Sequence, residues 1–151
     1  PAHIQHARNR LKRGAEIAGR DPAKSTIAAS VIYAVAANVA EGAQAAKEDI
    51  LFYLGYPEIN PLLEQSGFME EAETIRRVNR ERGKAEALAL ISERMLESLT
   101  IYGEAQHCRA KLEELIGAGL DVPIIRVSNV PYAEREKKQV FLRAIDSLRH
   151  F

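Results

Sequence analysis

Four stretches of the chain place apolar and charged residues at the spacing of an amphipathic helix. They cover residues 3–18, 39–54, 104–116 and 133–149. In the last stretch one face gathers apolar side chains, namely Val140, Phe141, Ala144, Ile145 and Leu148. Because such a helix buries its apolar stripe against another element, the pattern predicts four helices that cover a core.

Two further stretches are continuously apolar and lack the helical spacing. Residues 27–37 are rich in β-branched side chains and have turn residues on both flanks, which is typical of a strand buried on both faces. Since alanine is abundant there, a buried helix is the competing interpretation. Residues 120–127 follow Gly117-Ala118-Gly119 and contain Pro123, so they indicate a second strand that starts near this proline.

The region between the two predicted strands carries no strand pattern over residues 58–100. It predicts short helices over residues 59–66, 69–79, 84–89 and 92–99, with Ser92 as the N-cap of the last one. A helical region of this length exceeds what one crossover between strands needs. We therefore expect a single partial domain over residues 1–151, with a helical insertion over residues 56–100 inside it.

The predicted order of elements is incomplete as a fold. Apolar strands of an α/β protein need neighbouring strands and helices over both faces, and two strands alone do not provide them. The chain therefore either completes its sheet with another chain or forms the last part of a larger sheet or barrel.

Composition narrows the range of partners. The 21 basic and 21 acidic residues give a formal charge of zero, which argues against a nucleic-acid-binding surface. With Cys108 as its single cysteine, the chain has no internal disulfide and no cysteine cluster for zinc. No apolar stretch approaches the roughly 20 residues of a membrane span, and the first residues do not resemble a signal peptide. We expect a cytoplasmic protein that binds neither nucleic acid nor membrane.

Several motifs occur in an order that is typical of one family. Gly19-Arg20-Asp21-Pro22 precedes the first strand, Ala40-Glu41-Gly42-Ala43 opens the following helix, and Pro61-Leu62-Leu63-Glu64-Gln65-Ser66-Gly67-Phe68 lies in the insertion. Gly117-Ala118-Gly119-Leu120-Asp121-Val122-Pro123 leads into the second strand. In this order and spacing the chain resembles the luciferase-like flavin- or deazaflavin-dependent oxidoreductases. It departs from them at Glu104-Ala105-Gln106, where the family commonly has a helix-capping Thr-Pro-Glu.

The resemblance implies an α/β fold, the C-terminal part of a (β/α)8 TIM barrel. Residues 27–37 would be strand seven and residues 120–127 strand eight, whereas strands one to six have no counterpart here. The intact protein would then be an oxidoreductase of a family that includes monooxygenases, with a deazaflavin (coenzyme F-420) or FMN as cofactor and a small organic molecule as substrate. Because most of the pocket is absent, we expect this fragment to be inactive alone and not to bind the cofactor tightly.

Candidate cofactor-binding residues follow from the rule that barrel active sites form at the carboxyl ends of the strands. Asn38 follows the first strand, and Arg126, Ser128 and Asn129 lie where the second strand ends and the next loop begins. Arg126 could pair with a phosphate or carboxylate, or simply face solvent or a nearby carbonyl. Ser128 and Asn129 could bond a ring or phosphate, or make the loop turn and cap the next helix. No catalytic residue is assigned.

The histidines and the cysteine give weaker indications of a functional site. His3 and His6 stand three positions apart, a spacing that can hold a metal ion, but no third ligand is nearby in the sequence, which favours surface positions for the four histidines. Cys108 lies near a helix start beside Arg109, which could lower the pKa of its thiol. As a small apolar residue near the core, it could equally be inert.

Two functions are compatible with this sequence. In the first, the chain is part of an oxidoreductase barrel, and its partner is the missing barrel half. In the second, it is a non-catalytic α/β module that forms a homo-oligomer or completes the sheet of a partner chain.

Overall fold

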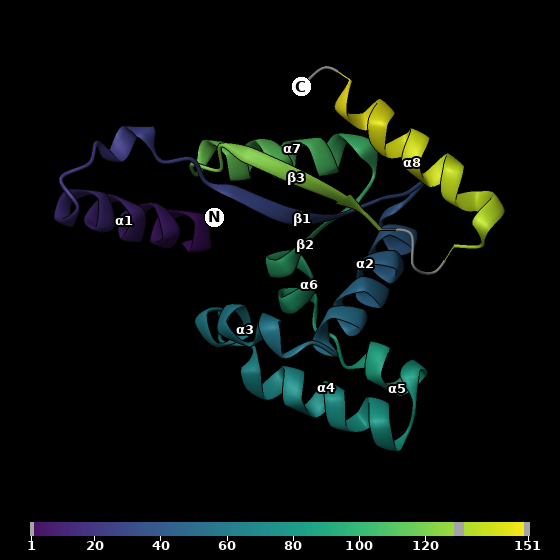
Figure 1. Ribbon diagram of the computed structural model, residues 1–151. Helices are drawn as coiled ribbons and strands as arrows, with labels where there is room; N and C mark the ends of the chain where they lie inside the picture. Colours follow the sequence, from purple (N-terminus) through teal and green to yellow (C-terminus); the bar gives the residue numbers. More distant parts are fainter. Residues whose placement is uncertain (1, 129–131, 150–151) are drawn as a thin grey trace.

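The computed structural model describes residues 2–128 and 132–149 and contains a three-stranded parallel sheet with helices on both sides (Figure 1). The elements follow in this order, where η marks a 3-10 turn: α1 (Ala2–Ile17), η1 (Pro22–Lys24), β1 (Ala28–Val35), α2 (Val39–Leu54), η2 (Pro57–Ile59), α3 (Asn60–Ser66), α4 (Met69–Glu81), α5 (Lys84–Ala89), α6 (Glu93–Leu99), β2 (Thr100–Gly103), α7 (Ala105–Gly117), β3 (Val122–Val127) and α8 (Glu134–Leu148).

The strand β1 is the centre of the sheet, and the strand order is β2-β1-β3. β3 runs parallel to residues 28–33 of β1, whereas β2 pairs only with residues 32–35. The predicted strands over residues 27–37 and 120–127 are therefore present as neighbours in the sheet, although β2 lies between them in the sequence. The edge of β1 over residues 28–31 and the outer edge of β3 have no strand beside them in the described part of the chain.

One face of the sheet, here called the helix face, is closed by α7 and α8 (Figure 1). Tyr33 is fully buried there, and Val35 is nearly so. They pack with Cys108 and Leu112 of α7 and with Ala144 of α8. On this face, the side chains of alternate β1 residues are thus covered by apolar side chains of the same chain.

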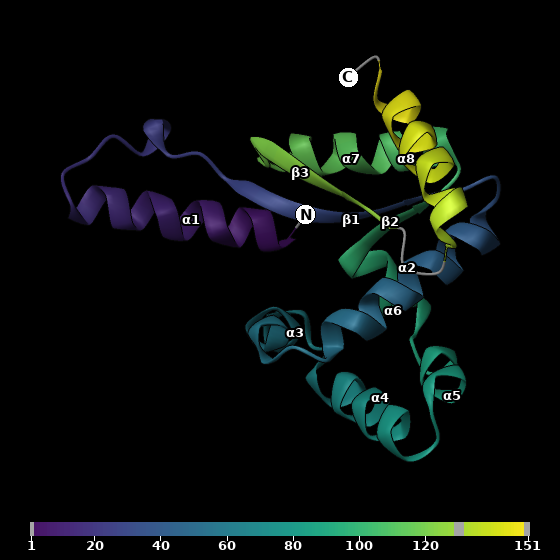
Figure 2. The ribbon, with the colours of Figure 1, turned by 45° about the vertical axis from the view of Figure 1, so that its right-hand side comes forward.

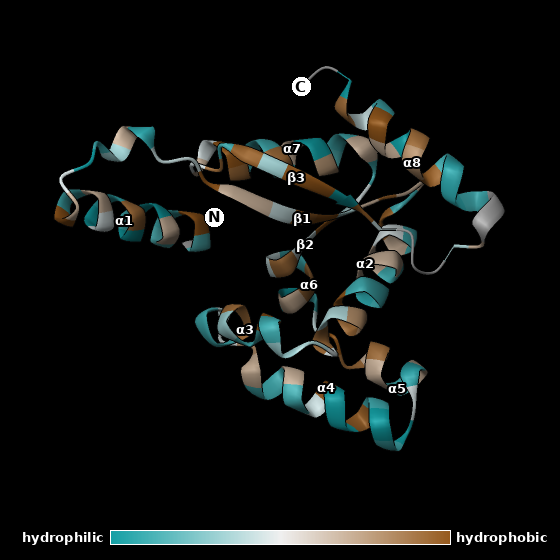
Figure 3. Cartoon of the chain, viewed as in Figure 1, coloured by the Kyte–Doolittle hydropathy of each residue, from teal (hydrophilic) through white to brown (hydrophobic). Residues whose placement is uncertain are grey.

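The opposite face is covered only near the carboxyl ends of the strands. Its uncovered part, here called the open face, consists of the neighbouring pairs Ala28–Val122 and Ser30–Ile124. Val122 is 46% exposed and Ile124 55% exposed, and hydrophobic colouring follows β3 in Figure 3. The prediction that residues 27–37 are buried on both faces is therefore wrong for the first half of β1. In the second half, Ala34 packs against the cluster formed by α2.

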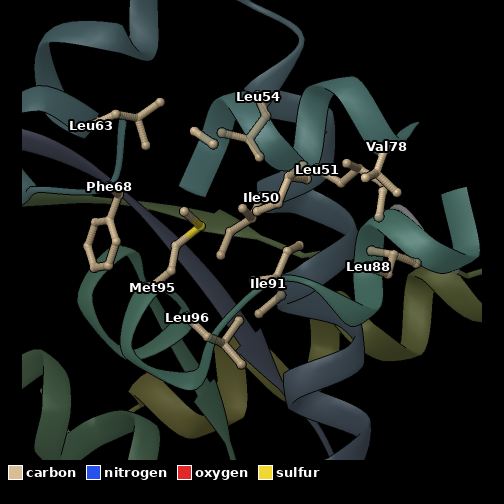
Figure 4. Close-up of a cluster of buried hydrophobic side chains, with 14 of the residues drawn as sticks. Ile50, Leu51, Leu54, Leu63, Phe68, Val78, Leu88, Ile91, Met95 and Leu96 are labelled. Atoms are coloured by element: carbon tan, nitrogen blue, oxygen red, sulfur yellow. The ribbon is translucent and has the colours of Figure 1, made fainter. Parts of the chain in front are cut away.

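The short helices α3 to α6 gather on α2, on the side of the molecule away from α7 and α8 (Figure 2). Ile50 and Leu54 of α2 meet Leu63 and Met95 in a fully buried cluster, here called the insertion cluster (Figure 4). Ile75 of α4 belongs to the same cluster. The four predicted short helices are confirmed, and the Ser92 hydroxyl accepts a hydrogen bond from the Met95 amide as an N-cap. The division of the chain at residue 56 stays a prediction, because α2 lies before it and belongs to the same apolar cluster.

The structure differs from the sequence pattern at β2, which was not predicted. Its four residues are too few to show alternation, and it is held by pairing with β1 rather than by its own pattern. Two predicted apolar stripes are also only partly covered. Leu11 of α1 is 40% exposed, and Phe141 and Ile145 of α8 are 41% and 54% exposed.

A close approach between backbones fixes α2 on the sheet. A Cβ atom on Gly42 would lie 2.5 Å from the Gly103 amide nitrogen and 2.9 Å from the Ala34 carbonyl oxygen. Gly103 itself has a φ of 117°, which favours glycine. The first turn of α2 can therefore reach the ends of β1 and β2 only because residue 42 has no side chain.

Candidate functional site

The candidate site lies at the carboxyl end of β3, where Arg126 and Ser128 meet α2. The helix is positioned by its own N-cap, because the Asn38 side chain accepts a hydrogen bond of 2.9 Å from the Glu41 amide. One face of α2 enters the insertion cluster through Ile50 and Leu54. The adjacent face turns Asp49 and Tyr53 toward the end of the last strand.

Arg126 is held by two groups of α2. Its Nη2 atom lies 2.8 Å from Asp49 Oδ1, and its guanidinium carbon lies 4.3 Å from the centre of the Tyr53 ring. The Nη2 and Oδ1 atoms are close but are not aligned as a hydrogen bond, so the contact is an ion pair. Arg126 Nε and Nη2 are both enclosed without a hydrogen-bond partner. A cation–π contact and an internal carboxylate thus stabilise this charge.

Asp49 joins the two candidate residues at the carboxyl end of β3, Arg126 within the strand and Ser128 directly after it. Its side chain is fully buried, and its second oxygen, Oδ2, accepts a hydrogen bond from the Ser128 hydroxyl. Ser128 Oγ is also 3.0 Å from the Ala45 carbonyl, and the Ser128 amide donates to the Tyr33 carbonyl. A fully buried carboxylate is stable only with such partners. The cluster therefore ties the end of β3 to α2.

The four predicted cofactor-binding residues are not all brought together. Arg126 and Ser128 converge on Asp49, whereas the Asn38 side chain caps α2 and also donates to Glu41 Oε1 at 3.0 Å. Asn129 lies outside the described residues. That these side chains bind a cofactor stays a prediction.

Asp49 and Tyr53 were missed in the sequence, although one signal was present. Asp49 stands three positions after Ala46 and beside Ile50, on the buried stripe of α2. A charged residue on such a stripe indicates a buried partner. The partner itself could not be found from spacing, because Ser128 lies 79 positions further along the chain.

A second buried carboxylate of α2 has a different partner. Glu48 is 8% exposed and forms an ion pair with Lys84 at the start of α5. Gln44 Nε2 lies 3.4 Å from its other oxygen. Of these two adjacent acidic residues of α2, Asp49 thus binds side chains at the end of the sheet and Glu48 binds a side chain of the insertion.

The remaining reactive side chains do not extend the site. Cys108 is fully buried in the helix face, and burial raises the pKa of its thiol to about 12. This agrees with the inert interpretation of the cysteine rather than with a lowered thiol pKa. Among residues 2–128 and 132–149, no three His, Cys, Asp or Glu side chains gather as a metal site would require.

Parallel strands with covering helices define an α/β protein, a class in which ligands commonly bind at the carboxyl ends of the strands, where Arg126 and Ser128 lie here. A family model of the luciferase-like monooxygenases matches residues 1–122. The chain therefore belongs to the luciferase-like monooxygenase family, and the resemblance seen in its motifs is confirmed.

A solved structure shows the same fold. The chain is similar to the coenzyme F-420-dependent tetrahydromethanopterin reductase from Methanopyrus kandleri, with 26% sequence identity and a TM-score of 0.72. The comparison covers 98% of this chain and 42% of the reductase chain, so this chain spans less than half the length of that relative. The helix-rich α/β architecture matches part of a luciferase-like barrel, which confirms the predicted fold class.

Across the part of the chain that the structure describes, no helix combines the length and apolar character that crossing a bilayer would require.

Proposed function

We propose that this chain forms the C-terminal part of a luciferase-like oxidoreductase, which transfers a hydride between a deazaflavin or flavin and a small organic substrate. The observation that carries the proposal is the open face. Val122 and Ile124 leave half of their surface in solvent on a parallel sheet, a type of sheet that proteins cover on both faces. Further strands of a barrel would cover this face and pair with its free edges.

The residues at the carboxyl end of the sheet fit one wall of such a site. Ile124 is an apolar surface, and Arg126 adds a donor-bearing planar group next to it on the same face of β3. A bound deazaflavin or flavin would supply the hydride chemistry, and the protein would supply orientation and exclusion of water. The other walls would come from the strands that this chain does not contain, so the chain alone is inactive.

The test is a fluorescence titration of the 151-residue chain with coenzyme F-420 and with FMN. We expect no saturable binding in the micromolar range. Fusing the chain to the first six strands of a luciferase-like barrel should then restore binding. Micromolar or tighter binding to the chain alone would contradict the proposal that it provides only one wall.

A second candidate function is a non-catalytic module that self-associates or completes a partner's sheet. The exposed apolar side chains of α8, Phe141, Leu142 and Ile145, favour it, because they add a further uncovered apolar surface. Sedimentation analysis separates the two functions. A stable oligomer of the chain would favour the module, whereas a monomer with one cooperative unfolding transition would exclude self-association.

A further inference from the structure

Arg126 is the natural candidate for binding an anionic group of a cofactor, since it stands at the carboxyl end of the last strand. Barrel proteins frequently bind phosphate near the ends of their final strands. The side chain is 28% exposed, so part of it reaches the surface. Whether it can accept an anion depends on what already neutralises its charge.

Asp49 already neutralises the charge of Arg126. Its carboxylate lies 2.8 Å from the Arg126 guanidinium and is fully buried, with Ser128 and α2 holding it in place. Its side chain has no exposed surface and accepts a hydrogen bond from Ser128, and its helix neighbours Ala46 and Ile50 are packed in the insertion cluster, so the fold holds it beside Arg126. An arriving phosphate would therefore meet a fixed negative charge beside the guanidinium, and the two anions would repel each other.

The stacking on Tyr53 restricts Arg126 further. One surface of the guanidinium is covered by the ring, and Nε and Nη2 are enclosed. The two-nitrogen fork with which arginine usually grips a phosphate is thus not available to a ligand. The same contacts hold the side chain in one position above the end of β3.

We propose that Asp49 is a specificity-determining residue that serves as the internal counter-ion of Arg126 and closes this end of the sheet to phosphate. Whatever part of a ligand lies against Arg126 is then uncharged, such as a ring edge or a carbonyl oxygen, and an anionic tail must bind elsewhere. The ligand assignment rests on the proposed function, whereas the exclusion of phosphate concerns the chain itself.

The test measures the midpoint of thermal unfolding with and without inorganic phosphate at constant ionic strength. Four proteins are compared: the wild type, Asp49→Asn, Glu48→Gln and the double variant Asp49→Asn with Arg126→Met. Glu48→Gln is the matched control, because it removes the same charge from the adjacent position of α2 but leaves Arg126 paired. Since phosphate stabilises proteins generally, differences between variants are the relevant quantity.

We expect equal shifts for the wild type, Glu48→Gln and the double variant, and a larger upward shift for Asp49→Asn alone. Equal shifts in all four proteins would overturn the proposal, since freed Arg126 would then bind no phosphate. If Asp49→Asn does not fold, the wild type is compared with Arg126→Met. A larger shift in the wild type would show an existing phosphate site and overturn the proposal, whereas equal shifts would support it. These outcomes do not depend on hydride transfer, which the coenzyme titration tests separately.

Discussion

The helix face and the open face belong to the same strands but differ in how far this chain completes them. On the helix face, Tyr33 is fully buried beneath α7 and α8. On the open face, Ile124 of the neighbouring strand is 55% exposed. Since residues of both faces alternate along one backbone, local propensity cannot cause the difference. The described residues supply the apolar layer over the helix face, whereas none of them covers Val122 and Ile124 on the open face to a similar degree.

The largest expected effect concerns Cys108 on the helix face. Burial raises the pKa of its thiol from 9.0 to about 12, so the thiolate fraction near pH 8 should fall about a thousandfold. A colorimetric thiol reagent should react very slowly with the folded chain and at the ordinary rate in urea. Because folding raises this pKa, the stabilising contribution is complete below pH 9.0 and declines as the pH rises toward 12. Rapid reaction of the folded chain would show that the helix face opens readily.

Truncation of Leu112 tests how firmly α7 packs on the helix face. This α7 side chain is 1% exposed, so Leu112→Ala should lower the free energy of unfolding by about 3 kcal/mol. Urea unfolding measures the change, provided the slope with denaturant stays constant. A loss below about 1 kcal/mol would mean that α7 is not firmly packed on the sheet.

A smaller loss is expected where α2 meets the sheet. Gly42→Ala would bring a Cβ within 2.5 Å of the Gly103 backbone, and it should cost about 2 kcal/mol through a shift of α2. Gly14→Ala on α1 is the matched control, because its Cβ would meet nothing within 4 Å. The control should be neutral or slightly stabilising. Equal effects of the two substitutions in thermal unfolding would contradict the close approach.

The smallest expected effect concerns the open face. Ile124→Ser should change the stability of the isolated chain by no more than about 0.5 kcal/mol, because half of the side chain is already in solvent. It should also reduce binding of an apolar fluorescent dye. A large destabilisation that depends on protein concentration would show instead that a second copy covers this face.

The sequence predicted the elements of the fold better than their environment. Helix spacing located α2 over residues 39–54, and β-branched content located β1, because both signals are local. β2 was missed because its four residues are stabilised by pairing with β1. The exposure of Ile124 was also not predictable, since an apolar strand gives the same pattern whether or not another segment covers it.

The candidate site was predicted only in part, because contacts between residues far apart in the sequence leave no local pattern. The rule for strand ends identified Arg126 and Ser128 as polar residues at the carboxyl end of one strand. Their shared partner Asp49 comes from a helix far away in the sequence, and only the folded arrangement shows that the Arg126 charge is balanced internally.

The pairing of β2 with the end of β1 also bears on the length of the segment that connects these two strands. The Ala36 amide donates to the Gly103 carbonyl at 2.8 Å, so the segment that leaves the sheet after β1 returns beside the point of departure. It is a closed loop, and the entropy of closing a loop grows slowly, by about 0.6 kcal/mol for each doubling of its length. The loop-closure term therefore changes little when residues are gained or lost between α2 and α6, and the main cost of a deletion there would be the lost packing of Leu63, Ile75 and Met95 against α2.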